Sequence, residues 1–265
     1  MLPFIQLGPW SVSTYALIYS LAFVIGGSLA YHRLGRAVER PEVLRNSLLL
    51  TIPGILIGML LLAWAEAGLG YLITGQPQTA TIRVYYGLAL AVVLARIYAH
   101  RLKISSRLLG DRVLPAFALG FAIARLGCLA NGCCGGAETD AFWGMYTPDE
   151  SGIWLMRHPT QLLSGLSELA LFWGLSAFNA WRDQKPTHAP AWLLRDGLVS
   201  NSYFFCFGAE RFLLEFLRSD FKPIWGPLSL PNLLMIPLMV WAAYHLWKIS
   251  TEKAPAAAVS SSAIV

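Results

Sequence analysis

The sequence predicts an all-α integral membrane protein with seven transmembrane helices, its N-terminus outside and its C-terminus cytoplasmic. Three observations predict this class. Of the 265 residues, 56% are hydrophobic and only 13% are charged, which is unusual for a soluble domain. Apolar stretches of about 17 to 22 residues, long enough to cross ~30 Å of hydrocarbon, recur along the chain. Basic residues collect in alternate connections between these stretches.

The predicted helices follow the apolar stretches in order. The first, at 14–32, comes after an opening segment without a basic n-region or a small-residue cleavage site, so we expect a retained helix rather than a signal peptide. The other six lie at 48–65, 84–100, 113–130, 161–181, 196–217 and 228–247. These segments lack the polar stripes that a soluble helical bundle would need, so we set that alternative aside.

Lysine and arginine indicate the orientation, because short cytoplasmic loops retain them. The connections rich in lysine and arginine follow the first, third, fifth and seventh predicted helices. They carry Arg33, Arg36, Arg40 and Arg45; Arg101, Lys103, Arg107 and Arg112; Arg182, Lys185 and Arg195; and Lys248 and Lys253. The alternate connections are poor in basic residues. The net charge of +5 therefore indicates cytoplasmic loops rather than nucleic-acid binding.

The chain reads as one transmembrane domain, residues 1–250, because no internal repeat or flexible linker divides it. Residues 251–265 are low in complexity and are expected to form a disordered cytoplasmic tail. The one long connection without a helical pattern, 135–160, is expected on the outer side. Long connections often form binding loops or lids.

Several ionisable residues fall within or beside the predicted helices, where charge is costly and a functional role is expected. They are Glu66, Arg125, His158, Glu168, Arg211, Glu215 and Arg218. With the orientation above, all of them lie in the outer half of the membrane. Two arginines that face one cavity favour an anion, and a guanidinium suits phosphate. The alternative is that these charges reach the headgroups and pair with one another.

One face of the predicted helix at 196–217 gathers charge. Arg211, Glu215 and Arg218 follow one another at i, i+4 and i+7 and therefore share this face. Glu210 is adjacent in sequence and points about a quarter-turn away. We therefore expect it outside the cluster.

Four segments carry a family resemblance, in the right order along most of the chain. They are LPFIQLGPWSVSTYALIY near the start, ARLGCLANGCCGG from residue 124, HPTQLLSGLSELALF from residue 158 and FGAERFLLEFLRSD from residue 207. Together they resemble the prolipoprotein diacylglyceryl transferases, bacterial inner-membrane enzymes that move the diacylglyceryl group of phosphatidylglycerol onto a prolipoprotein cysteine. The resemblance implies a multi-pass inner-membrane protein, phosphatidylglycerol and a lipobox signal peptide as partners, and no cofactor.

The resemblance also implies roles for named residues. Catalytic roles fall on Arg125, Arg211, Glu215, Tyr85 and His158. Substrate-binding roles fall on Tyr15, Arg125, Gly127, Asn131, Gly136, Gln161 and Arg218. In the implied mechanism the two arginines Arg125 and Arg211 hold the phosphate, the acceptor thiolate attacks the glycerol carbon, and glycerol phosphate leaves. His158, Glu168 and Glu215 are the alternatives for the base that removes the thiol proton.

The chain departs from the family pattern at several positions. Cys128 stands in place of a signature asparagine, Cys133 in place of a glutamate, and Tyr85 in place of a histidine. Phe207 replaces the tyrosine that usually opens the last motif. These departures keep two alternatives open: a non-catalytic or re-specialised phospholipid-binding paralogue, and a thiol-redox or metal-handling membrane protein.

The cysteines themselves leave three interpretations open. The spacing of Cys128, Cys133 and Cys134 matches neither the usual zinc spacing nor a redox C-x-x-C, so no metal ligand is assigned. If the chain turns at Asn131 and Gly132, Cys128 can form a disulfide with either of the other two, and the outer compartment favours this. The second interpretation is a site for a soft metal such as Cu(I), and the third is a set of free thiols that line the pocket. Cys206 is expected in the core.

Overall fold

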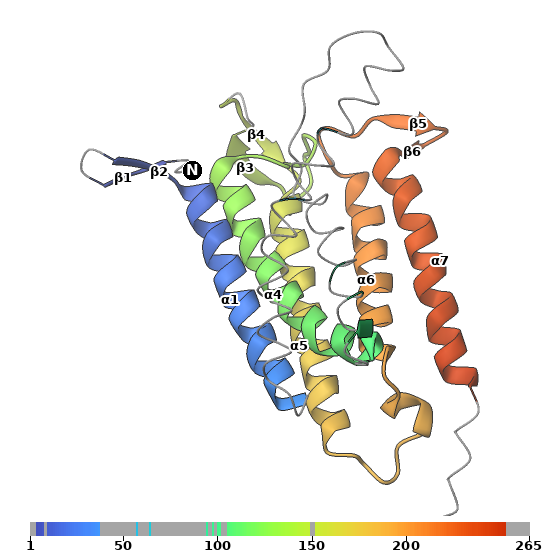
Figure 1. Cartoon of the computed structure of the whole chain (residues 1–265). Coiled ribbons are helices and arrows are strands. Elements are labelled where there is room, and N and C mark those ends of the chain that lie inside the picture. Colours follow the sequence, from blue (N-terminus) through green and yellow to red (C-terminus); the bar gives the residue numbers. More distant parts are fainter. Residues whose placement is uncertain are drawn as a thin grey trace, which may run out of the picture. The chain divides into compact units, whose positions relative to one another are not determined.

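A computed structural model describes residues 4–7, 10–37, 105–148 and 152–252, with six single residues between 57 and 101. Its helices are α1 (Thr14–Ala37), α4 (Ser106–Asn131), α5 (Thr160–Asp183), α6 (Leu198–Glu215) and α7 (Leu230–Thr251), with a short 3₁₀ helix η1 (Ala191–Leu194) (Figure 1). These five α-helices confirm five of the predicted ones. The predicted helices at 48–65 and 84–100, with Glu66 and Tyr85, lie almost entirely outside the described residues.

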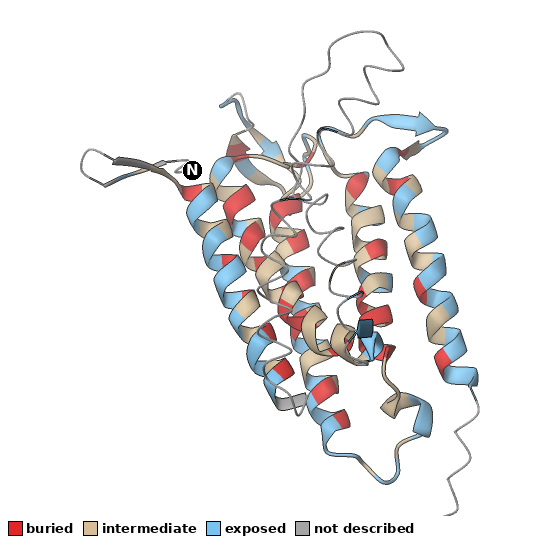
Figure 2. Cartoon of the chain, in the orientation of Figure 1, coloured by how far each residue is buried: buried red, intermediate tan, exposed pale blue. Residues whose placement is uncertain are grey.

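Among the described residues, three helices are long and apolar enough to cross a membrane. They comprise Thr14–Gly35, Ser106–Asn131 and Leu230–Thr251. Large apolar side chains stay exposed along them, for example Val24 on α1 and Val240 and Trp247 on α7, where Figure 2 shows much of the helix surface exposed. Exposed apolar surface of this extent suits lipid rather than water. The structure thus confirms a helical membrane protein, while the number of spans, the orientation and the single domain with its tail stay predictions.

The chain divides into two compact units, residues 1–26 with 114–265 and residues 27–113. In the first unit α6 packs against both α5 and α7. The first half of α1 meets α4 at a pair of glycines: a Cβ added at Gly120 would lie 3.1 Å from the Ala22 carbonyl oxygen, and one at Gly26 would lie 3.2 Å from the Ala116 carbonyl oxygen. Small residues allow this close backbone approach, as is common between membrane helices.

The described residues contain three antiparallel hairpins, of which one precedes α1, one lies between α4 and α5, and one lies between α6 and α7. They pair β1 (Phe4–Leu7) with β2 (Trp10–Ser13), β3 (Met145–Pro148) with β4 (Trp154–Arg157), and β5 (Pro223–Trp225) with β6 (Leu228–Ser229). The described residues of the predicted connection at 135–160 form no helix before α5, as predicted, and contain the second hairpin. Four-residue strands are too short to show a period in the sequence.

Candidate functional site

The site is built around the C-terminal end of α4. Gly132 has a φ of 75° and follows the last helical residue. The Gly132 amide donates to the Leu129 carbonyl at 3.3 Å, and the Cys133 amide donates to the Cys128 carbonyl at 3.2 Å. This pair of bonds is a Schellman motif, which brings the side chains at its two ends together. Cys128 and Cys133 occupy those two ends, so the turn at Gly132 explains why they meet.

The first turn of α5 holds the loop that follows. The Thr160 hydroxyl donates to the Cys134 carbonyl at 2.9 Å, and the buried Gln161 amide donates to the Cys133 carbonyl at 2.9 Å. Cys134 has a φ of 61°, a left-handed conformation that is uncommon for a residue other than glycine. The hydrogen bonds from α5 thus fix a loop that is locally strained.

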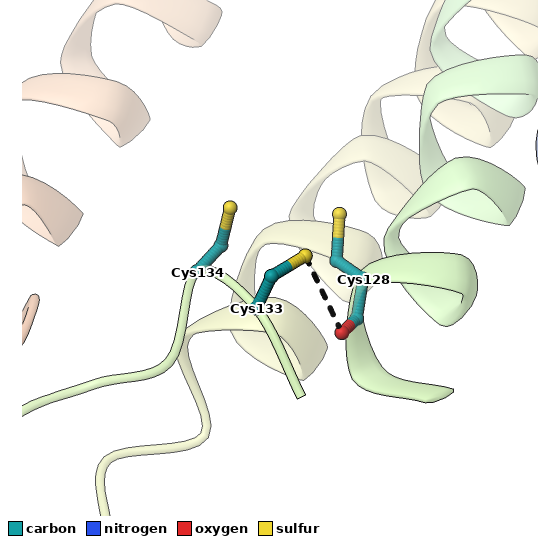
Figure 3. Close-up of side chains that lie close together, drawn as sticks. All are labelled: Cys128, Cys133 and Cys134. Carbon is teal, nitrogen blue, oxygen red and sulfur yellow. Dashed lines mark hydrogen bonds between the residues drawn. The ribbon is translucent and has the colours of Figure 1, made fainter. Parts of the chain in front are cut away.

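The three cysteines form one cluster, hereafter the thiol cluster: Cys128, Cys133 and Cys134. Their sulfur atoms all lie within 4.8 Å of one another (Figure 3). The Cys133 thiol points to the Cys128 carbonyl oxygen at 3.8 Å, and the Tyr19 hydroxyl lies 3.4 Å from the Cys128 sulfur. The ring of Tyr15 lies beside that of Tyr19, with centroids 4.2 Å apart. The structure has these cysteines as free thiols.

Arg218 connects the thiol cluster to the charges after α6. Its guanidinium donates two hydrogen bonds of 2.7 Å to Asp220 and interacts with the Cys134 sulfur. Hydrogen bonds from Cys128 and Cys133, and then the charge of Arg218, lower the pKa of the Cys134 thiol, although burial opposes this. The hydrogen bonds from Arg218 likewise lower the pKa of Asp220. Negative charge is therefore stabilised beside Arg218.

Arg211 and Glu215 form an ion pair on α6. Their closest nitrogen and oxygen atoms are 3.2 Å apart, and Arg218 approaches the same carboxylate at 3.8 Å. Glu215 is buried, and the Ser229 hydroxyl donates to it at 3.1 Å. The structure thus brings together the three residues that helical periodicity places on one face. Glu215 lies between the two arginines and is their counter-ion.

Arg125 comes to the same region from α4. Its Cβ lies 3.4 Å from the position of a Cβ added at Gly165, so the start of this side chain packs directly against α5. The guanidinium stacks over Phe121, 4.4 Å from the ring centroid. Its Nε is buried and has no hydrogen-bond partner among the described residues. Arg211 lies within electrostatic range of Arg125, so the two arginines act on one region.

Two carboxylates interact with Arg125, the buried Glu168 and the half-buried Glu210. The Tyr203 hydroxyl donates to Glu168 at 3.2 Å, and Glu210 interacts with both Glu168 and Arg125. That Glu210 lies outside the face shared by Arg211, Glu215 and Arg218 stays a prediction, and its interactions with Glu168 and Arg125 were not predicted. The sequence carried a signal for it: Tyr203 and Glu210 are seven residues apart on α6, which places them on one helix face.

The remaining predicted residues have different surroundings. The ring of His158 accepts a 3.1 Å hydrogen bond from the Trp143 indole and makes no hydrogen bond to the arginines in the described part of the chain. Asn131 is exposed at the end of α4, and Tyr85 lies outside the described residues. Cys206, expected in the core, is exposed, because the described helices leave its face of α6 uncovered.

The two predicted glycines are close-packing positions. A Cβ added at Gly127 would lie 3.2 Å from the Tyr19 ring. A Cβ at Gly136 would lie 2.3 Å from the His158 carbonyl oxygen. Gly136 also donates its amide to that oxygen at 3.1 Å. Gly127 therefore allows α4 to approach Tyr19 of α1, and Gly136 allows the loop after α4 to lie against His158.

Comparison with known proteins finds similarity over most of the chain. A family model described as "Prolipoprotein diacylglyceryl transferase" matches residues 3–248. A phosphatidylglycerol–prolipoprotein diacylglyceryl transferase from Bordetella parapertussis is 28% identical over 262 residues, covering 90% of this chain and 91% of that protein. The protein of the same name from Aeromonas salmonicida is 30% identical over 260 residues, covering 90% and 88%. A second enzyme of this kind from Clostridium perfringens is 29% identical over 263 residues, covering 89% and 93%.

Proposed function

The chain belongs to the prolipoprotein diacylglyceryl transferase family, and we propose that it moves the diacylglyceryl group of phosphatidylglycerol onto the cysteine thiol of a prolipoprotein. The observation that carries the proposal is the pair Arg125 and Arg211. The two come from different helices, lie within electrostatic range of each other, and one keeps a buried Nε without a hydrogen bond in the described part of the chain. A buried guanidinium nitrogen without an acceptor is stabilised by an oxyanion.

Phosphate binding follows from the charges around this pair. Glu215 offsets part of the charge of Arg211 and Arg218. Arg125 is stacked on Phe121, and Glu168 and Glu210 interact with it electrostatically, while its buried Nε keeps no hydrogen bond among the described residues. The free Nε of Arg125, with Arg211 nearby, is therefore the donor that we assign to the anion. Phosphatidylglycerol supplies such an anion in its phosphodiester.

The transfer then forms one bond and breaks one. The acceptor thiolate forms a carbon–sulfur bond to the terminal glycerol carbon of the diacylglyceryl group. The carbon–oxygen bond to phosphate breaks, and glycerol phosphate leaves. Its developing negative charge is stabilised by the two arginines, and this stabilisation is greatest in the transition state.

The thiol proton must pass to a base, because a free cysteine has a pKa of about 8.5. Of the three predicted bases, Glu215 is engaged by two arginines and a hydroxyl, and the His158 ring is bonded to Trp143. Glu168 accepts one hydrogen bond, from Tyr203, and lies with Glu210 beside Arg125, so the two carboxylates can share a proton. We therefore assign proton acceptance to this carboxylate pair.

The setting we propose is the bacterial inner membrane, with seven spanning helices and the site in the outer leaflet. The support is the alternation of basic loops and the outer-half position of the charged residues. The acceptor is the lipobox cysteine of a prolipoprotein signal peptide. This placement brings donor lipid and secreted acceptor to the same side of the membrane.

The test combines purified protein, phosphatidylglycerol vesicles and a lipobox peptide, with mass spectrometry of the peptide. We expect a diacylglyceryl adduct, and a loss of rate of about 100-fold or more in Arg125→Ala and Arg211→Ala, as for removal of a group that stabilises transition-state charge. Lys248→Ala, in the last turn of α7, is the control and should leave the rate unchanged.

Two outcomes would count against the proposal in different ways. Absence of adduct, under conditions where one of the relatives forms it, rules out the transferase. If phosphatidylglycerol still binds in that case, the chain is a phospholipid-binding paralogue. Transfer that survives both arginine substitutions leaves the function standing and refutes the mechanism.

A further inference from the structure

The thiol cluster plays no part in the transfer described above, yet it is the densest group of reactive side chains in the described part of the chain. Its three sulfur atoms come from the end of α4 and the loop held by α5, and lie within 4.8 Å of one another. We propose that Cys128, Cys133 and Cys134 bind one soft, thiophilic metal ion, for which Cu(I) is the best match. This proposal does not rest on the transferase activity.

The spacing of the sulfur atoms fits a shared ion. With metal–sulfur bonds of about 2.3 Å, three sulfurs around one ion in a plane lie about 4 Å apart. Sulfurs already within 4.8 Å reach that arrangement by small side-chain rotations. A disulfide needs two sulfurs about 2.05 Å apart and leaves the third thiol unused.

The ligand set favours Cu(I) over zinc. In the part of the chain that the structure describes, no histidine, aspartate or glutamate joins the three thiols as a fourth ligand. Structural zinc sites in proteins almost always have four ligands. Three soft thiolates without a fourth donor suit Cu(I), which is stable in trigonal coordination. The nearby Tyr19 hydroxyl, 3.4 Å from the Cys128 sulfur, is a hard donor and supports the thiolate by hydrogen bonding.

The loop is held in place before any ion binds. The Schellman motif fixes Cys128 and Cys133, and the bonds from Thr160 and Gln161 fix the carbonyls of Cys134 and Cys133. Cys134 is kept in a left-handed conformation by this framework. A backbone held in a strained conformation by its surroundings is typical of sites that organise ligands.

The local charge also suits a bound ion. Coordination forms three metal–sulfur bonds and releases the thiol protons to solvent, with no change in oxidation state. Three thiolates and one Cu(I) leave a net charge of two negative units on the cluster. Arg218 interacts directly with Cys134, and Arg211 lies within electrostatic range of it, so positive charge is available to offset this.

The test is a competition titration of the full-length protein, solubilised, reduced and kept anaerobic, with Cu(I) supplied by a coloured chelator. We expect one equivalent of Cu(I) per chain. We expect Cu(I) binding to weaken in each of three variants, Cys128→Ser, Cys133→Ser and Cys134→Ser. Loss of a group that only supports a metal ligand weakens binding by about 10- to 100-fold, and the loss of a ligand itself should exceed this. Cys206→Ser is the matched control and should bind as the unsubstituted protein does. X-ray absorption should then report three sulfur neighbours.

The outcomes separate the alternatives. Failure of the reduced protein to bind Cu(I), or equal weakening by Cys206→Ser, overturns the proposal. Tighter binding of Zn(II) than of Cu(I) in the same assay overturns the assignment to Cu(I). If the protein is isolated with a disulfide among these cysteines, reduction followed by uptake of one equivalent supports the site, and reduction without uptake refutes it. Unchanged thermal unfolding of the serine variants shows that lost binding is not lost folding.

Discussion

At the scale of single residues, Gly136 shows how little space surrounds the loop after α4. Its amide bonds to the His158 carbonyl, and a Cβ there would lie 2.3 Å from that oxygen and 2.5 Å from the His158 Cβ. The obstruction includes backbone, which a side-chain rotation cannot relieve. A methyl group at this position must therefore displace the chain.

We expect Gly136→Ala to lower the free energy of unfolding by about 1 to 3 kcal/mol, the usual cost of overpacking. The measurement is thermal or denaturant unfolding in detergent. Gly174→Ala on α5, where an added Cβ meets nothing within 4 Å, is the matched control and should be neutral or slightly stabilising. Equal effects of the two substitutions would contradict the packing argument.

Tyr203 and Glu168 form a second residue-scale feature. Both side chains are buried, and the phenol donates to the carboxylate at 3.2 Å. We expect Tyr203→Phe to destabilise the protein by about 1 to 3 kcal/mol, because a buried acceptor loses its donor. Tyr244→Phe on the exposed side of α7 is the control and should change stability little. A Tyr203→Phe protein as stable as the control would show that the hydrogen bond contributes nothing.

The sequence predicted correctly which residues lie close together where both are on one helix and the helical period determines their spacing. Arg211 and Glu215 pair as their spacing indicates. Glu210 was missed because its neighbours Glu168 and Tyr203 come from packing of α6 on α5 and from a seven-residue spacing that was not used. The contact of His158 with Trp143 depends on a hairpin that no period in the sequence reveals.

At the scale of elements, α1 and α4 approach through glycine. The Cβ position of Gly120 lies 3.1 Å from the Ala22 carbonyl oxygen of α1. We expect Gly120→Leu to separate the two helices and to lower the unfolding midpoint by the equivalent of about 1 to 3 kcal/mol or more. Gly174→Leu is the matched control because its surroundings are open. A midpoint shift no larger than that of the control would show that this contact does not hold the helices.

Helix positions were predictable from hydropathy, and helix ends mostly from turn residues. The observed α6 lies within two residues of the predicted segment at each end, and α4 ends just before Gly132, where a turn was anticipated. The hairpins were not predictable, since MYTP and WLMR pair through backbone hydrogen bonds, and their side chains show no pattern typical of strands. The grouping of the three thiols depends on the turn at Gly132 that ends α4.

At the scale of the whole molecule, composition was enough to indicate a helical membrane protein. It could not position the arginines with respect to each other, because that depends on which faces of α4 and α6 meet. Orientation rests on the basic loops and is open to direct measurement.

We expect Phe142→Cys, at a residue 94% exposed in the connection before α5, to react with a membrane-impermeant maleimide in intact cells. Lys185→Cys, after α5, should react only after permeabilisation, because its connection is predicted to be cytoplasmic. Both substitutions are made in a background with the four native cysteines changed to serine. Labelling of Lys185→Cys in intact cells would reverse the predicted topology.

The turn at the end of α4 has a consequence for how this loop changes during evolution. Its two hydrogen bonds join main-chain atoms of Cys128, Leu129, Gly132 and Cys133, so the turn needs the left-handed glycine and places no demand on the side chains at either end. Other side chains can thus stand at the positions of Cys128 and Cys133 without loss of the loop. Among homologues that keep the glycine, we expect these two positions to covary, since the same turn always brings their side chains together.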